Sequence, residues 1–144
     1  MVVELRNKIL VAGGAVAVAV GAYLPWLRIN PNLPPDAEVP TINYTGMGAG
    51  FEGFDFVLLG AVGLVLLLHS SSFWTPIRIV TGVGVAVFPV YYLSYSTLFR
   101  FSATFVPALG WYLTVLGGTL LSHGGGRQLP SLIHRLKATA TLRE

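Results

Sequence analysis

The residues of this chain that could do chemistry are three histidines, six carboxylates and a number of hydroxyl groups, without any cysteine. A thiolate nucleophile, a disulfide and a cysteine-ligated metal are therefore excluded. His69, His123 and His134 follow no metal-binding spacing. No serine lies in the Gly-x-Ser-x-Gly turn of a hydrolase. We expect no catalytic residue, metal site or cofactor, and interpret the protein as non-enzymatic.

Glu52 and Asp55 are close enough in sequence to handle a proton or an ion together. Asp55 also begins an apolar stretch, where a carboxylate interacts favourably with a helix dipole. We prefer this structural role. Transporters usually carry charges near the middle of the membrane, whereas the apolar stretches here have Gly, Ala, Val and Leu at their centres.

A cluster of tyrosines, Tyr91, Tyr92 and Tyr95, follows Pro89 closely. The proline is expected to kink its helix. The tyrosines suit an aromatic belt at the outer membrane surface. Alternatively, they line a pocket with Pro89 that holds a small apolar ligand, such as a lipid or a quinone.

Four long apolar stretches contain or border most of these residues. About 17–25 apolar residues cross a bilayer as a helix. Charged residues make up only 10% of the chain, against about 25% in soluble domains, and the mean hydropathy is +0.69. We predict an all-α membrane protein, a four-helix transmembrane bundle within residues 1–126 and a tail at 127–144. The expected spans are about 8–27, 54–70, 77–96 and 101–122.

The positive charges predict the orientation of the spans. Only Arg28 and Arg100 fall on one side, and the other Lys and Arg residues fall on the opposite side. Both termini are therefore expected in the cytoplasm. This placement also explains the pI of about 9.5 without a nucleic-acid partner. We expect a multi-pass protein of the cell membrane or of a virion envelope.

The basic start and the first apolar stretch also resemble a secretory signal peptide, with small residues at Val20-Gly21-Ala22. The apolar run continues through Leu27, which is long enough to span. We therefore expect the segment to be retained.

The segment 28–53 is expected to form an ordered extracellular loop. Its β-favouring run, 39–45, suggests one short β-hairpin. Asn43 heads an Asn-x-Thr triplet, which is a candidate glycosylation site on the outer side.

Small residues recur at four-residue spacing along three of the spans, and such faces allow helices to approach closely in lipid. We expect these faces to pack within the bundle, or alternatively to form a homodimer seam. The residues are Gly13, Ala17 and Gly21 in the first span, Gly82 and Ala86 in the third, and Gly110 and Gly118, with Thr114 between them, in the fourth.

Membrane-interface residues are expected at the ends of the spans. Trp26 and Trp74 suit the headgroup level, and Arg78 can extend toward the headgroups. The tail resembles a short amphipathic helix that lies on the inner leaflet, with Arg135 and Lys137 on its polar face.

The chain resembles a group of small uncharacterised four-span membrane proteins of archaea, notably haloarchaea, and of actinobacteria. The similarity lies in Pro25-Trp26, in 50–55 and in 110–113 with Gly117-Gly118. It implies the four-span fold and no particular activity. The outline is also similar to claudin-type proteins, but the cysteines of their first outer loop are absent.

The small-residue faces suggest the leading hypothesis for function, because they offer more packing surface than one small bundle needs. The protein is interpreted as an accessory or structural subunit of a larger membrane assembly or envelope, or as a homo-oligomer. The alternative hypothesis is a small binding module that holds a lipid or a quinone-like ligand under the extracellular loop.

Overall fold

The computed structural model describes residues 2–38, 54–70, 74–95 and 104–126, and these form four α-helices and one two-stranded sheet. In chain order the elements are α1 (Val2–Tyr23), β1 (Leu27–Ile29), α2 (Phe54–Leu67), the 3₁₀ turn η2 (Leu68–Ser70), α3 (Thr75–Tyr95), β2 (Phe105–Pro107) and α4 (Leu109–Gly126). The predicted helical class is therefore confirmed.

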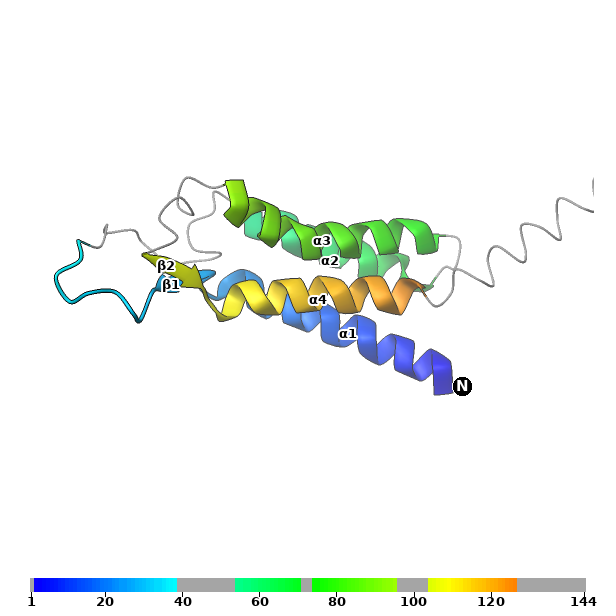
Figure 1. The fold of residues 1–144 in the computed structure, drawn as a ribbon. Coiled ribbons are helices and arrows are strands. Elements are labelled where there is room, and N and C mark those ends of the chain that lie inside the picture. The colour runs from blue at the N-terminus through cyan, green and yellow to red at the C-terminus, as the bar shows by residue number, and fades with distance from the viewer. Residues whose placement is uncertain (1, 39–53, 71–73, 96–103, 127–144) are drawn as a thin grey trace, which may run out of the picture.

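The helices run up and down, and α4 lies between α1 and α3 (Figure 1). Helix α2 packs against both α1 and α3. The two strands lie at one end of the bundle, which we call the ribbon end. Turn η2, the start of α1 and the start of α3 lie at the opposite end, which we call the turn end. Helix α4 is therefore the element that holds the bundle together.

Two helices contain segments long and apolar enough to cross a membrane, Leu5–Tyr23 in α1 and Thr75–Ser94 in α3. The apolar part of α2, Phe56–Leu67, is shorter. At 1.5 Å per residue a helix of 14 residues extends about 21 Å, less than the roughly 30 Å of a hydrocarbon core. The helices α1 and α3 support a membrane location.

Helix α1 ends at Tyr23, two residues before Pro25, because the residue before a proline disfavours helical geometry. The chain then turns, and Trp26 packs into the core with only 1% of its surface exposed. Its indole Nε1 donates a hydrogen bond to the Gly21 carbonyl at 2.9 Å, and its ring meets the edge of Phe88. Trp26 is therefore a buried core residue at the end of α1, and its level in a membrane stays a prediction.

The sheet is an antiparallel ribbon in which Leu27 faces Pro107 and Ile29 faces Phe105. The backbone of Ala108 extends the ribbon toward α4 by donating to the Trp26 carbonyl at 2.8 Å. The first strand thus pairs with residues just before α4. The expected hairpin run, 39–45, lies outside the described residues.

Helix α4 begins at Leu109 and not near residue 101. Phe105–Pro107 is extended instead, since a proline lacks the N–H that a helix interior needs and restricts the residue before it. The amphipathic tail, with Arg135 and Lys137, and Asn43 lie outside the described residues.

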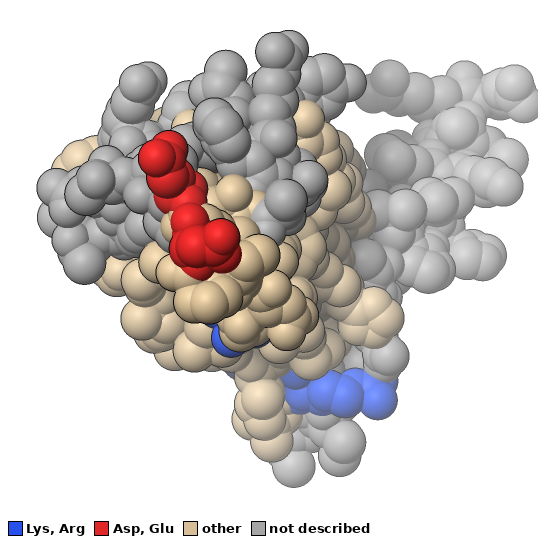
Figure 2. Space-filling model, turned by 60° about the vertical axis from the view of Figure 1, so that its left-hand side comes forward, with Lys and Arg blue, Asp and Glu red and all other residues tan. Residues whose placement is uncertain are grey.

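The two ends of the bundle differ in charge. Asp36 and Glu38 follow β1, and acidic side chains gather at the ribbon end in Figure 2. Arg6 and Lys8 lie in the first turns of α1, and Arg78 in the first turn of α3, so these three cations belong to the turn end. Arg28 in β1 also lies at the ribbon end. Among the side chains that the structure describes, two acidic groups and one cation thus lie at the ribbon end, against three cations at the turn end.

Candidate functional site

The closest helix contacts join α4 to α1 and involve glycines from both. A Cβ atom added at Gly117 would lie 2.7 Å from the Gly14 carbonyl oxygen, and one at Gly14 would lie 2.8 Å from that of Gly117. Gly21 and Gly110 face each other in the same way, at 2.9 and 2.8 Å. Only glycine permits this approach, which is the type of packing expected where water does not drive association.

A second close interface joins α4 to α3. A Cβ atom at Gly118 would collide with the Ala86 backbone nitrogen and lie 2.9 Å from the Gly82 carbonyl oxygen. A Cβ atom at Gly82 would lie 2.6 Å from the backbone nitrogen of Ser122. The predicted positions Gly82, Ala86, Gly110 and Gly118 thus lie in contacts within this bundle.

The packing face of α1 differs from the predicted one by one residue. Gly13 is exposed, and a Cβ atom added there would have nothing within 4 Å. Ala17 is half-buried. The close contacts come from Gly14 and Gly21, with Val18 between them against Gly117. The prediction for Gly13 is therefore wrong for packing inside the bundle.

Pro89, Tyr91 and Tyr92 line neither of the two pockets described below, and a ligand pocket at these residues stays a prediction. Pro89 is fully buried, and its carbonyl accepts a hydrogen bond from Trp111 Nε1 at 3.1 Å. Tyr92 packs beside Phe88 with ring centroids 5.8 Å apart, whereas Tyr91 is exposed. The side chain of Tyr95 lies outside the described part. Pro89 and Tyr92 therefore belong to the packed α3–α4 region.

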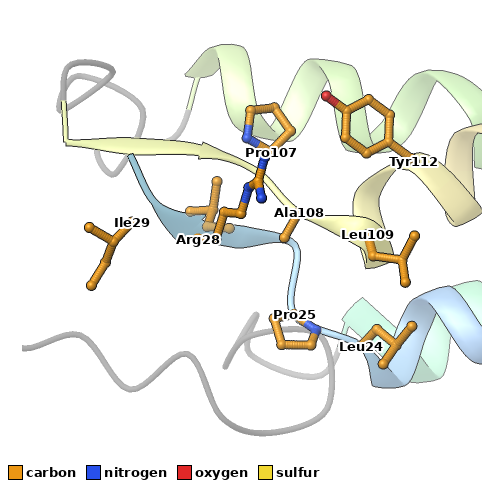
Figure 3. Close-up of a pocket in the computed structure, with 9 residues that line it drawn as sticks. Leu24, Pro25, Arg28, Ile29, Pro107, Ala108, Leu109 and Tyr112 are labelled. Atoms are coloured by element: carbon orange, nitrogen blue, oxygen red, sulfur yellow. The ribbon is translucent and has the colours of Figure 1, made fainter. Parts of the chain in front are cut away.

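An apolar pocket of about 660 Å³ lies instead at the ribbon end. The turn after α1, both strands and the first turn of α4 form its walls (Figure 3). Most of its lining is aliphatic, and Arg28 and Tyr112 contribute the polar groups. The lining residues are Leu24, Pro25, Leu27, Arg28, Ile29, Pro107, Ala108, Leu109 and Tyr112. Pockets of 300–1,000 Å³ are of the size that holds small molecules.

A smaller apolar groove of about 260 Å³ separates α2 from α3. Val57 and Ala61 line it from α2, and Thr81 and Gly84 line it from α3. A Cβ atom added at Gly84 would meet nothing within 4 Å, and the same holds at Gly60 and Gly63 of α2. Its volume is below the range of ligand pockets, and it suits a side chain from a neighbouring helix.

A buried polar cluster lies at the turn end. Arg78 is 1% exposed. Its guanidinium donates to Thr75 Oγ1 at 2.9 Å, to the His69 carbonyl at 3.2 Å, and contacts His69 Nδ1 at 3.0 Å. The prediction that Arg78 extends to the headgroups is therefore wrong, whereas Trp74 beside it is exposed. A guanidinium always donates, so His69 Nδ1 is the acceptor and carries no proton.

Burial lowers the pKa of His69, and the positive charges of Arg78 and Lys8 lower this pKa further. The neutral imidazole is thus the form that fits the cluster. No three residues from among His, Asp and Glu lie together as metal ligands within the described parts of the chain.

Comparisons of the chain with protein-family models, with curated proteins and with solved structures find no match. Assignment of a function therefore depends on the two glycine interfaces, the α2–α3 groove and the ribbon-end pocket.

Proposed function

We propose that this chain is a non-enzymatic, four-span membrane protein that acts as an accessory subunit of a larger membrane assembly, with both termini in the cytoplasm. The alternating helix directions and the two longest apolar helices support the spans. Arg6 and Lys8 at the turn end, against Asp36 and Glu38 after β1, support the orientation.

The topology is tested with single cysteines, since the chain has none of its own. We expect Asp36→Cys to react with a membrane-impermeant maleimide in intact cells. Arg6→Cys should react only after the cells are opened. Labelling of both positions in intact cells would exclude the proposed orientation.

The α2–α3 groove is the observation that carries the subunit role. Gly84 lines this groove and has open space where a side chain would be, so the groove has room for a side chain of a partner. Close approach across small residues is a main source of helix association in lipid. We propose that a transmembrane helix of another subunit packs into this groove.

The test is to purify the protein gently, in native membrane discs, and to identify the proteins bound to it. Gly84→Leu fills the groove and should release the partner without disturbing the bundle, because a Cβ atom there has no neighbour within 4 Å and the rest of the side chain can occupy the groove. Gly13→Leu is the matched control on α1, where there is equal open space. A strict monomer without a bound protein would contradict the proposal. Dissociation by Gly13→Leu alone would indicate a homo-oligomer seam on α1 instead.

The alternative function is a binding module for a lipid or a quinone-like ligand, and the ribbon-end pocket favours it. Its volume and aliphatic walls suit such a ligand. Leu109→Trp should fill the pocket, because Leu109 lies at its edge with 62% of its surface exposed. We expect this variant to lose a retained ligand. Equal retention by Leu109→Trp would reject the pocket as the binding site.

A further inference from the structure

The ribbon-end pocket carries a positive charge that has no counter-charge in the described protein. Arg28 lines the pocket, and its guanidinium forms no hydrogen bond or ion pair with any described residue. Asp36 and Glu38 are exposed at the same end, and neither is paired with this guanidinium. The hydroxyl of Tyr112, on the opposite wall, also forms no hydrogen bond among the described residues.

The polar and apolar parts of the pocket are separated in space. In Figure 3 the guanidinium of Arg28 and the hydroxyl of Tyr112 both extend toward Pro107. Leu24 and Leu109 lie away from these polar groups, nearer to the helices. Such an arrangement matches an amphiphile, because hydrocarbon and a charged group require different surroundings.

The position of the pocket on the helices points to the source of the ligand. The pocket lies where α1 ends and α4 begins, so it is at the level where a spanning helix leaves the hydrocarbon for the headgroups. Ile29, Leu109 and Tyr112 are exposed at its rim, and a bilayer lipid could enter from the side. A neutral quinone would leave the charge of Arg28 without a partner.

We propose that this pocket binds a phospholipid with an anionic headgroup from the surrounding bilayer. Its headgroup phosphate contacts Arg28 and accepts a hydrogen bond from Tyr112, and the start of an acyl chain packs along Leu24 and Leu109. Guanidinium groups suit phosphate because they offer paired donors. The inference rests on the alternative function proposed above and names its ligand class.

The experiment places the full chain in bilayer discs with equal amounts of phosphatidylglycerol and phosphatidylcholine. The protein is then extracted in mild detergent, and the lipids that stay bound are quantified by mass spectrometry. One basic residue near an anionic surface contributes about 1 kcal/mol, which corresponds to about a fivefold preference. We therefore expect phosphatidylglycerol to be enriched about fivefold over phosphatidylcholine in the bound fraction.

Four variants distinguish headgroup recognition by Arg28 from lipid binding by the apolar part of the pocket. Arg28→Gln should abolish the enrichment while some lipid stays bound, and Arg28→Lys should retain most of it. Arg6→Gln removes an exposed arginine at the turn end and is the matched control, so its enrichment should equal that of the unchanged protein. Leu109→Trp should remove both lipids.

The outcomes distinguish this inference from the function on which it rests. Equal retention of both phospholipids, unaltered in Arg28→Gln but lost in Leu109→Trp, would overturn the anionic ligand and leave a lipid-binding pocket. In a second preparation a quinone is added to the discs. Its retention in place of phospholipid would also overturn the anionic ligand and would leave the pocket as a site for a neutral ligand. If no lipid or quinone is retained, or if Leu109→Trp has no effect, both the inference and the binding function are overturned.

Discussion

The two sides of the bundle use glycine in opposite ways. On the α4 side, Gly14, Gly117 and Gly118 lie so close to a neighbouring backbone that no side chain would fit. On the α2 side, Gly60 and Gly63 adjoin open space. Glycine therefore lies in a closely packed helix interface in one region and on an unpacked helix surface in the other. Only the contacts around each glycine distinguish the two cases.

The largest effect is expected from Gly118→Ala. The added methyl group would collide with the backbone of Ala86, and a backbone cannot move aside as a flexible side chain can. We expect a loss of about 2–3 kcal/mol in the free energy of unfolding, measured by denaturant titration in detergent micelles. An unchanged stability would mean that α3 and α4 are farther apart than described.

The loss of one hydrogen bond between helices should have the next largest effect. Trp111→Phe removes the donor to the Pro89 carbonyl and should cost about 1 kcal/mol in the same titration. Tyr112→Phe is the control on the neighbouring, exposed position, and should have no measurable effect in lipid-free micelles. Equal losses in the two variants would mean that the Trp111 hydrogen bond is not the source of the effect.

A glycine-to-alanine substitution on the α2 side should raise the free energy of unfolding, where the same substitution on the α4 side lowers it. Gly84→Ala meets no neighbour and removes the flexibility of a glycine within α3, so we expect a gain of about 0.5–1 kcal/mol for the isolated protein. This variant and Gly118→Ala change the same residue type in the same way. If both lost stability, the contrast between the two sides would be refuted.

The smallest change in the free energy of unfolding should come from the protonation of His69 as the pH falls. Because the pKa of His69 lies below its ordinary value of 6.5 in the folded protein, the unfolded chain takes up a proton first as the pH falls. The free energy of unfolding should decrease from about pH 6.5 down to the folded-state pKa and then level off. His69→Asn keeps an acceptor for Arg78 that does not titrate, and should remove this slope. His123→Gln, at the exposed position in α4, should retain it.

The sequence was sufficient to predict four apolar stretches, helical structure and packing at Gly21, Gly82, Gly110 and Gly118. It was not sufficient to predict which face of α1 packs against α4. Gly, Ala and Val fill that helix on every side, so the stripes through Gly13 and Gly14 look alike until a partner is present. The four spans and their orientation stay predictions, since two helices meet the length and hydropathy of a span.

Other differences came from contacts between distant parts of the chain. Pro25-Trp26 at the end of an apolar stretch is typical of a membrane interface, but the ribbon folds the chain back and buries Trp26. Arg78 is buried and donates hydrogen bonds to Thr75 and to the His69 carbonyl, which its sequence context does not reveal. The late start of α4 did have a local signal, because Pro107 disfavours a helix through the preceding residues.

The pairing of β1 with β2 and of α1 with α4 also sets an order of events during synthesis. The ribosome makes α1 early, yet the residues that face Gly14 and Gly21 and pair with Leu27 are made after α2 and α3. Until then the first helix has neither its closest neighbour nor its ribbon partner. A nascent chain that stops before residue 104 thus leaves the face of α1 with Gly14 and Gly21 without its partner helix. Quality-control factors that recognise unassembled helices would bind the chain at that face.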